Sequence, residues 1–326
     1  MKKLLSLLLS LIILAVIYWK IDFHGLIMVI RNCNGWLMTI SLGMVVPLTL
    51  LTAIRLQQLM PHGARLGFGE ANRLILVASV MNIILPMKMG DIAKAYFLKN
   101  QAHLDGSYSL SLVIFEKACD MISLLLWCAF GLILYPKKDL FFWVMTGSVI
   151  LGLITCLLLF SSRKFTQICF ALMELLVPKR FRSKLEKLHS SWDEMHDFFW
   201  SDKIQLFKIA STSVFIWFLH LLQIWFFILT LKAWTPFLAN LALAPLAILV
   251  GLLPLTFAGI GTRDAALIVL YHPFFNAPTA AALGLLCTLR YLLPAIFGLP
   301  FLGKYLPTIR TMIKKPGTLS QVGTEL

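Results

Sequence analysis

The chain has 326 residues, of which 59% are hydrophobic and only 13% are charged. Soluble domains hold roughly 45–50% apolar and about 25% charged residues, so this chain cannot cover a water-facing surface with polar side chains. A soluble globular fold, disorder, a collagen and a disulfide scaffold are excluded, and an integral membrane protein remains. The net charge of +14 does not indicate nucleic acid, because the cytoplasmic loops of membrane proteins collect Lys and Arg.

The apolar runs predict the helices in chain order. Met1-Lys2-Lys3 precedes a first helix from Leu4 to Trp19, which no small-x-small cleavage site follows. Later spanning runs cover 36–54, 108–135, 140–160, 206–231 and 279–302. Two others, 71–86 and 238–255, are interrupted by Pro and Gly and lead into the short apolar stretches 92–98 and 265–271.

One long polar stretch, 161–203, separates the two sets of apolar runs. Its apolar residues recur at helical spacing, at Phe181, Leu185, Leu188, Trp192, Met195 and Phe199. This pattern predicts an amphipathic helix at the membrane interface, with a solvated linker as the alternative. The tail 304–326 is polar and basic.

The distribution of Lys and Arg predicts the topology. If all eight runs crossed the membrane with the N-terminus inside, the basic 161–203 stretch would lie outside, against the positive-inside tendency. It becomes cytoplasmic if the elements near 71–98 and 238–271 enter and leave on one side. We therefore expect an all-α polytopic membrane protein with six spanning helices and two re-entrant, broken ones. Its halves are 1–160 and 204–303, both termini are cytoplasmic, and 161–203 connects the halves.

The two broken elements resemble each other. The first reads ILPMKMGD from residue 84 and the second LLPLTFAGIGTRD from residue 252. One would enter from the cytoplasm and the other from outside, which predicts inverted repeats. Paired segments interrupted by Gly and Pro are the best sequence indication of a transport site.

Each broken element places a basic side chain beside the start of a short helix. Lys88 lies just before one start and Arg263 within the other. A cation and free helix N–H groups together suit a phosphate. The alternative is that Asp91 and Asp264 merely cap the short helices while the two cations neutralise them.

Other charges lie inside apolar runs. Glu116 and Asp120 share one helix face beside Lys117, and Arg290 is alone in the last run. Charges at mid-membrane need partners, so we expect Arg290 to pair with Glu116 or Asp120. Such a pair fixes helix packing or belongs to a charged cavity for a polar head group. Arg55, at the end of its run, is expected to snorkel at an interface.

Enzymatic motifs are missing from the sequence: it has no GxSxG, HExxH or Walker A motif, no CxxC pair and no Cys/His cluster. We therefore expect no catalytic residue, no metal and no cofactor, and no ATP-driven pump.

Three motifs resemble the lysylphosphatidylglycerol synthase transmembrane-region family, the flippase-like domain of the bacterial multiple peptide resistance factor. They are Asn82-x-x-x-Pro86-x-Lys88-x-Gly90-Asp91-x-x-Lys94, Glu116-Lys117-x-x-Asp120 and Gly259-x-Gly261-x-Arg263-Asp264. The family usually has Arg where this chain has Lys88, Lys94 and Lys117, Gly at Ala258 and Glu at Asp264. Lys keeps the charge but loses bidentate phosphate contacts.

The resemblance implies inverted halves with re-entrant helices around a lipid cavity in the bacterial cytoplasmic membrane. It also implies translocation of a phospholipid, aminoacylated in the parent case. Without the aminoacyl-transferase domain of fused relatives, this chain is not expected to make the aminoacyl lipid itself. A separate lipid-modifying enzyme and a homodimer stay open as partners.

We therefore expect a lipid translocase acting on an anionic or aminoacylated phospholipid or a lipid-linked head group. One alternative is a membrane-embedded transferase with Asp91 or Glu116 as its base; another is a non-transporting envelope scaffold. The candidate binding residues are Asn82, Lys88, Gly90, Asp91, Lys94, Glu116, Lys117, Asp120, Gly259, Gly261, Arg263, Asp264 and Arg290.

Overall fold

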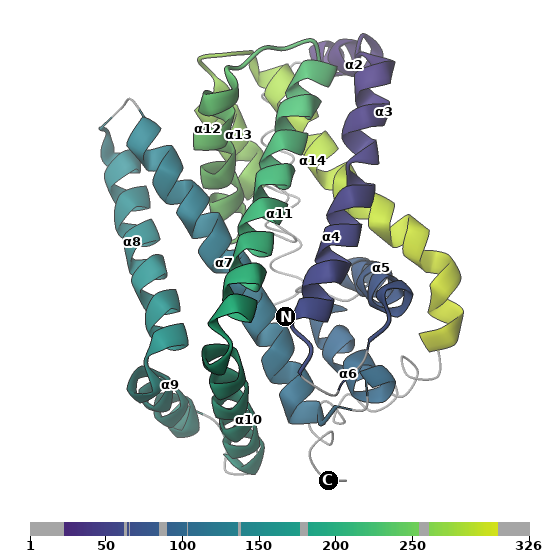
Figure 1. The fold of residues 1–326 in the computed structure, drawn as a ribbon. Coiled ribbons are helices and arrows are strands. Elements are labelled where there is room, and N and C mark those ends of the chain that lie inside the picture. The colour runs from purple at the N-terminus through teal and green to yellow at the C-terminus, as the bar shows by residue number, and fades with distance from the viewer. Residues whose placement is uncertain are drawn as a thin grey trace.

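A computed structural model of the chain describes residues 23–61, 64, 66–84, 90–102, 104–135, 138–176, 182–253 and 261–305. Within these ranges every regular element is helical (Figure 1), which confirms the predicted all-α fold class. The predicted first helix, 4–19, lies outside the described residues, as does all of the tail beyond residue 305.

Five of the described helices are long and apolar enough to cross a membrane. They are Gly35–Gln58, which comprises α3 (Gly35–Gly43) and α4 (Val45–Gln58), α7 (Gly106–Leu134), α8 (Leu140–Ser161), α11 (Lys203–Thr230), and Ala277–Tyr305, which contains α14 (Ala277–Gly298). A short helix, α2 (Phe23–Arg31), precedes them. These spans match five of the six predicted ones, and the chain is a multi-pass membrane protein.

Local sequence sets the limits of these helices. Pro47 has no N–H to donate to the carbonyl of Gly43. The helix is interrupted nearby, at Met44, which lies between α3 and α4. Polar side chains accept hydrogen bonds from the first-turn N–H groups of five helices. These N-cap residues are Asn34, Asp105, Asp139, Asp202 and Asn276.

Each half also contains two shorter helices that pack against each other. In the first half these are α5 (Phe68–Ile84) and α6 (Gly90–Ala102), and in the second α12 (Phe237–Gly251) and α13 (Thr262–Tyr271). The connecting residues 85–89 and 254–260 lie outside the described part of the chain. A long span precedes each pair, α3 with α4 in the first half and α11 in the second, and a long helix follows it, α7 or α14.

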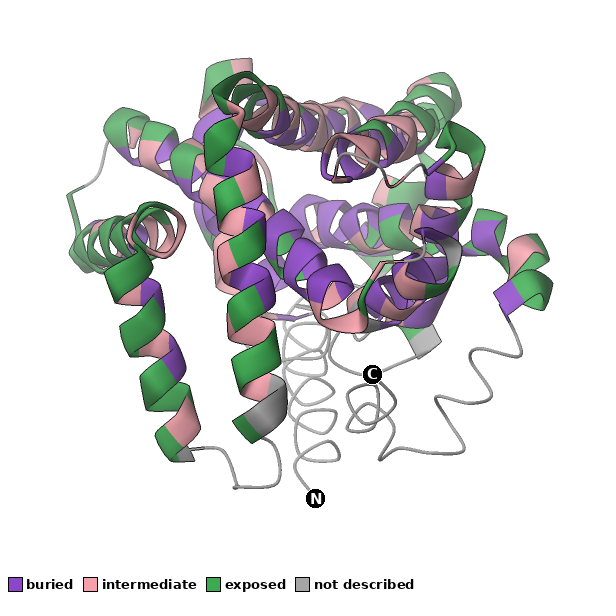
Figure 2. Cartoon of the chain, turned by 60° about the horizontal axis from the view of Figure 1, so that its bottom comes forward, coloured by how far each residue is buried: buried purple, intermediate pink, exposed green. Residues whose placement is uncertain are grey.

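The two halves interlock through these elements. Helix α7 packs along α12 of the other half, and α14 packs along α5. A Cβ atom at Gly131 of α7 would overlap the carbonyl oxygen of Ala242, and one at Gly298 would overlap that of Leu76. Across the described bundle, buried residues lie mostly on the inward faces of the helices and exposed ones on their outer faces (Figure 2).

The connector 161–203 differs from its prediction because it forms two helices, α9 (Arg163–Leu176) and α10 (Arg182–Ser201). The apolar face of α10 packs against the protein: Trp192, Met195 and Phe199 are buried, and the Phe199 ring stacks on Phe115 at 4.3 Å. Protein therefore covers this part of the apolar face of α10, and the predicted helical spacing is confirmed from Leu185 onward, while the location of the connector at the membrane interface stays a prediction. Phe181 lies outside the described residues.

The interlock predicts a cost for side chains at Gly131. Gly131→Ala should lower the stability by about 1–3 kcal/mol, as in other overpacked interiors, because α7 must move away from α12. Gly147→Ala in α8 is the control, since its added Cβ meets nothing within 4 Å. The measurement is the Tm in detergent; equal Tm values for the two variants would contradict this packing.

Candidate functional site

A cavity of about 420 Å³ lies among α4, α5, α6, α7, α11, α12 and α14. This volume falls in the range of about 300–1,000 Å³ that small-molecule sites occupy. Its lining mixes apolar side chains with charged ones from both halves of the chain. The cavity is therefore the place in the described structure where the charges of the membrane helices meet.

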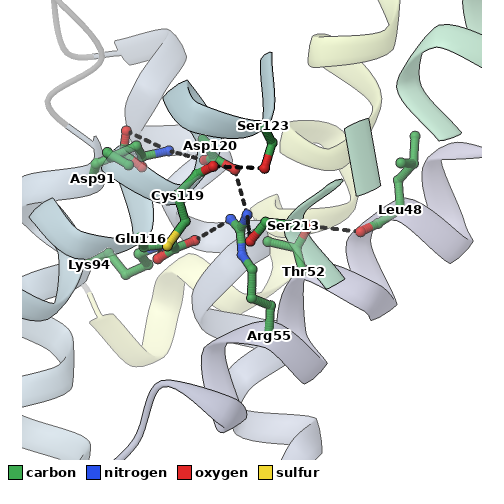
Figure 3. Close-up of polar contacts among 11 residues, drawn as sticks. Leu48, Thr52, Arg55, Asp91, Lys94, Glu116, Cys119, Asp120, Ser123 and Ser213 are labelled. Carbon is green, nitrogen blue, oxygen red and sulfur yellow. Dashed lines mark hydrogen bonds and ion pairs between the residues drawn. The ribbon is translucent and has the colours of Figure 1, made fainter. Parts of the chain in front are cut away.

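Arg55 of α4 is the central cation of the cavity (Figure 3). Its Nη2 donates to Glu116 Oε1 at 2.9 Å, and its Nη1 donates to Asp120 Oδ1 at 2.5 Å and to Ser213 Oγ at 3.3 Å. The residue is only 2% exposed. The prediction that Arg55 snorkels at an interface is wrong, because its guanidinium is buried between two carboxylates of α7.

Lys94 of α6 binds the other side of Glu116. Its Nζ donates to Glu116 Oε2, and both side chains are buried. Each carboxylate oxygen of Glu116 thus has a cation, one from α4 and one from α6. The spacing of Glu116 and Asp120 on one helix face, read from the sequence, therefore serves to gather two other helices around α7.

Lys117 extends the same network toward the cavity. Its Nζ lies 3.3 Å from Asp91 Oδ2 and 3.7 Å from Asp120 Oδ2, and its side chain is about half exposed. Three cations and three carboxylates are thus joined across α4, α6 and α7. We call this set the charge network: Arg55, Asp91, Lys94, Glu116, Lys117 and Asp120.

Arg290 of α14 lines the cavity without joining the charge network. Its Nη2 donates to the Tyr291 hydroxyl at 2.9 Å, and its Nη1 to the carbonyl oxygen of His220 at 3.5 Å. The predicted pairing of Arg290 with Glu116 or Asp120 is wrong, because Arg55 and Lys94 hold Glu116, and Arg55 and Lys117 hold Asp120. Arg290 forms no ion pair within the described ranges.

Arg263 and Asp264 lie at the start of α13 and are not part of the cavity lining. Arg263 donates to Asp264 Oδ1 from Nε at 3.0 Å and from Nη2 at 2.7 Å, and further to α14 at Gly284 O and Thr288 Oγ1. Asp264 Oδ2 accepts from the N–H of Gly261 at 3.1 Å. This arrangement matches the capping alternative.

Glycines shape the starts of both short helices. Gly261 has a φ of 101°, a backbone conformation that favours glycine. A Cβ at Gly90 would overlap the carbonyl oxygen of Ala78, so α6 begins directly against α5. Asn82 of α5 lines the cavity. Two other predicted site residues, Lys88 and Gly259, lie outside the described part of the chain.

Several polar lining residues are missing from the sequence-based set, among them Arg55, His220 and Gln223. Each lies in or at the end of an apolar run, and a polar residue in such a place is the sequence signal that could have identified them. No group of three or more His, Cys, Asp or Glu residues that could hold a metal ion occurs among the described residues.

Comparison with known proteins supports the family resemblance. A family model described as "Lysylphosphatidylglycerol synthase TM region" matches residues 3–298, which includes the connector and most of both halves. No curated protein matches the chain.

The charge network predicts an unequal response to the loss of two arginines. Arg55→Gln leaves Glu116 and Asp120 short of a buried cation and should cost about 3–5 kcal/mol of stability. Arg73→Gln is the matched control, because Arg73 makes a half-exposed pair with Glu70 that is worth at most about 1 kcal/mol.

Thermal unfolding in detergent measures both effects. Adding Asp120→Asn to Arg55→Gln restores the charge balance and should recover part of the loss. An Arg55→Gln variant as stable as Arg73→Gln would contradict the central place of Arg55.

Proposed function

The chain belongs to the lysylphosphatidylglycerol synthase transmembrane-region family, and from this premise we propose that it is a lipid translocase. It moves an anionic or aminoacylated phospholipid, or a lipid-linked head group, across the bacterial cytoplasmic membrane. The head group passes through the charged cavity while the acyl chains stay in the bilayer. The observation that carries this proposal is the set of buried charges around a cavity inside a membrane protein.

Energetics support a functional reason for these charges. An ionised side chain at the centre of a membrane helix costs on the order of 2.5–3.5 kcal/mol on insertion scales. Seven Asp, Glu, Lys and Arg residues of the described chain line this one cavity: Arg55, Asp91, Lys94, Glu116, Lys117, Asp120 and Arg290. Helix packing alone needs only an ion pair buried away from any cavity, such as Arg263 with Asp264. A polar path for a head group needs charges that face a cavity, and the seven do so.

The arrangement of the broken helices supports inverted repeats with re-entrant elements. Helix α12 has only 15 residues, fewer than the ~20 that a spanning helix needs, and α5 begins with a polar turn containing Glu70, Asn72 and Arg73. Each half orders its helices as long, broken pair, long, and each long final helix packs on the other half's pair. The excess of Lys and Arg in the connector favours cytoplasmic termini.

The geometry favours translocation over transferase chemistry at Glu116. A general base needs a carboxylate oxygen that can accept the substrate's proton, and both oxygens of Glu116 are already bound by Arg55 and Lys94. A scaffold function would not require a charged cavity. Transport of a head group uses both the paired charges and the space beside them.

Reconstitution in liposomes tests the proposal. Phospholipids with a fluorescent group on one acyl chain keep their natural head groups, and a membrane-impermeant quencher reports which leaflet holds them. The wild-type protein should speed the exchange of at least one anionic or aminoacylated phospholipid between leaflets. No acceleration for any of them would contradict the proposed function.

Filling the cavity should abolish the movement. Ser79→Trp places a bulky side chain in the lining of the cavity on α5. Ser148→Trp on the exposed face of α8 is the matched control, since both serines donate to the carbonyl four residues earlier. Transport by Ser79→Trp at the control's rate would place the lipid path elsewhere.

A further inference from the structure

The charge network leaves no net charge for a ligand to neutralise. Its three cations, Arg55, Lys94 and Lys117, face three carboxylates, Asp91, Glu116 and Asp120, and every one is in an ion pair. A ligand charge must therefore be met by a residue outside the network.

Arg290 is the remaining Lys or Arg of the described lining. It is 4% exposed, and the carbonyl and hydroxyl that it contacts are neutral. Its buried Nε has no hydrogen-bond partner within the described structure. A buried cation without an anion is costly, and an unsatisfied N–H adds to that cost. An anion in the cavity would relieve both.

Other unsatisfied polar atoms belong to the same lining. Asn82 Oδ1, Gln223 Oε1 and His220 Nδ1 are buried and have no partner in the described structure. The first two are acceptors that suit the hydroxyl or amino groups of a head group. The cavity thus offers an isolated cation together with acceptors on two other helices, α5 and α11.

Exposed residues belong to the lining of the cavity, and one of them is next to Arg290 in the sequence. Tyr291, which receives the Arg290 hydrogen bond, is 47% exposed, and Leu252 is 39% exposed; both line the cavity. We infer that the cavity opens toward lipid at these side chains. A head group could therefore reach Arg290 sideways from the membrane, with its acyl chains left outside.

We propose that Arg290 binds the phosphate of the transported lipid and that the cavity selects head groups with one net negative charge, such as phosphatidylglycerol. This inference rests on the proposed function and narrows its substrate class. The described lining carries four cations and three carboxylates, an excess of one positive charge that a phosphodiester monoanion neutralises. An aminoacylated lipid with a net positive charge would add to the excess instead of removing it.

Head-group selectivity is measured in two ways on the same protein. The first is leaflet exchange in phosphatidylcholine liposomes that contain a trace of acyl-labelled phosphatidylglycerol, phosphatidylethanolamine or lysylphosphatidylglycerol. The second is equilibrium binding of the same lipids to the detergent-solubilised protein. The wild type should prefer phosphatidylglycerol in both. Inorganic phosphate should not displace it; displacement would assign Arg290 to a free phosphate and overturn the lipid assignment.

Variants at position 290 test the residue itself. Arg290→Gln should weaken phosphatidylglycerol binding by about tenfold or more, the effect expected from losing a charge-assisted contact, and should remove the preference over phosphatidylethanolamine. Arg290→Lys keeps the charge and should retain the preference. Arg31→Gln, at an exposed arginine at the end of α2, is the control and should behave like the wild type.

The outcomes separate this inference from the proposed function. Lipid exchange without a head-group preference, or a preference unchanged in Arg290→Gln, overturns the inference and leaves translocation standing. Selective binding that depends on Arg290 without any leaflet exchange overturns translocation and supports the head-group assignment. If Arg290→Gln does not fold, as judged by its Tm, two results still test the inference. The wild type must prefer phosphatidylglycerol, and Arg290→Lys must keep that preference; the absence of either overturns the inference.

Discussion

The structure depends on one buried guanidinium. Arg55 reaches from α4 to two carboxylates of α7, and Lys94 of α6 binds the second carboxylate oxygen of Glu116 (Figure 3). In a membrane, apolar contacts give helices little preference for one another over lipid. Paired charges do give such a preference, because separating them inside the bilayer costs far more than in water. The wall of the cavity is therefore held by electrostatics.

The two halves use their charges differently. In the first half, Lys94 and Asp91 of α6 take part in a network beside the cavity. In the second half, Arg263 and Asp264 form an ion pair with each other at the start of α13. Similar sequence motifs thus give a charged wall on one side and a structural cap on the other. This asymmetry leaves Arg290 of α14 as the second half's charge in the cavity.

Hydrophobicity made most of the fold predictable, since the described spans follow from the apolar runs. Side-chain partners were less predictable. Arg55 ends its apolar run as a snorkelling residue would, and only the contacts of its side chain with α7 and α11 distinguish the two situations. Arg290 and Glu116 have opposite charges, but Arg55 and Lys94 lie nearer to Glu116. Helical spacing on α10 identified an apolar face but could not tell protein from lipid as its cover.

A structure of the wild-type protein determined by electron cryomicroscopy in nanodiscs that contain phosphatidylglycerol tests the account most directly. We expect a lipid whose phosphate lies within hydrogen-bond distance of the Arg290 guanidinium, with its acyl chains outside the bundle. Arg55 should still bind both Glu116 and Asp120 in that complex. A cavity without lipid beside an otherwise ordered bundle, or a head group bound away from the cavity, would contradict the account.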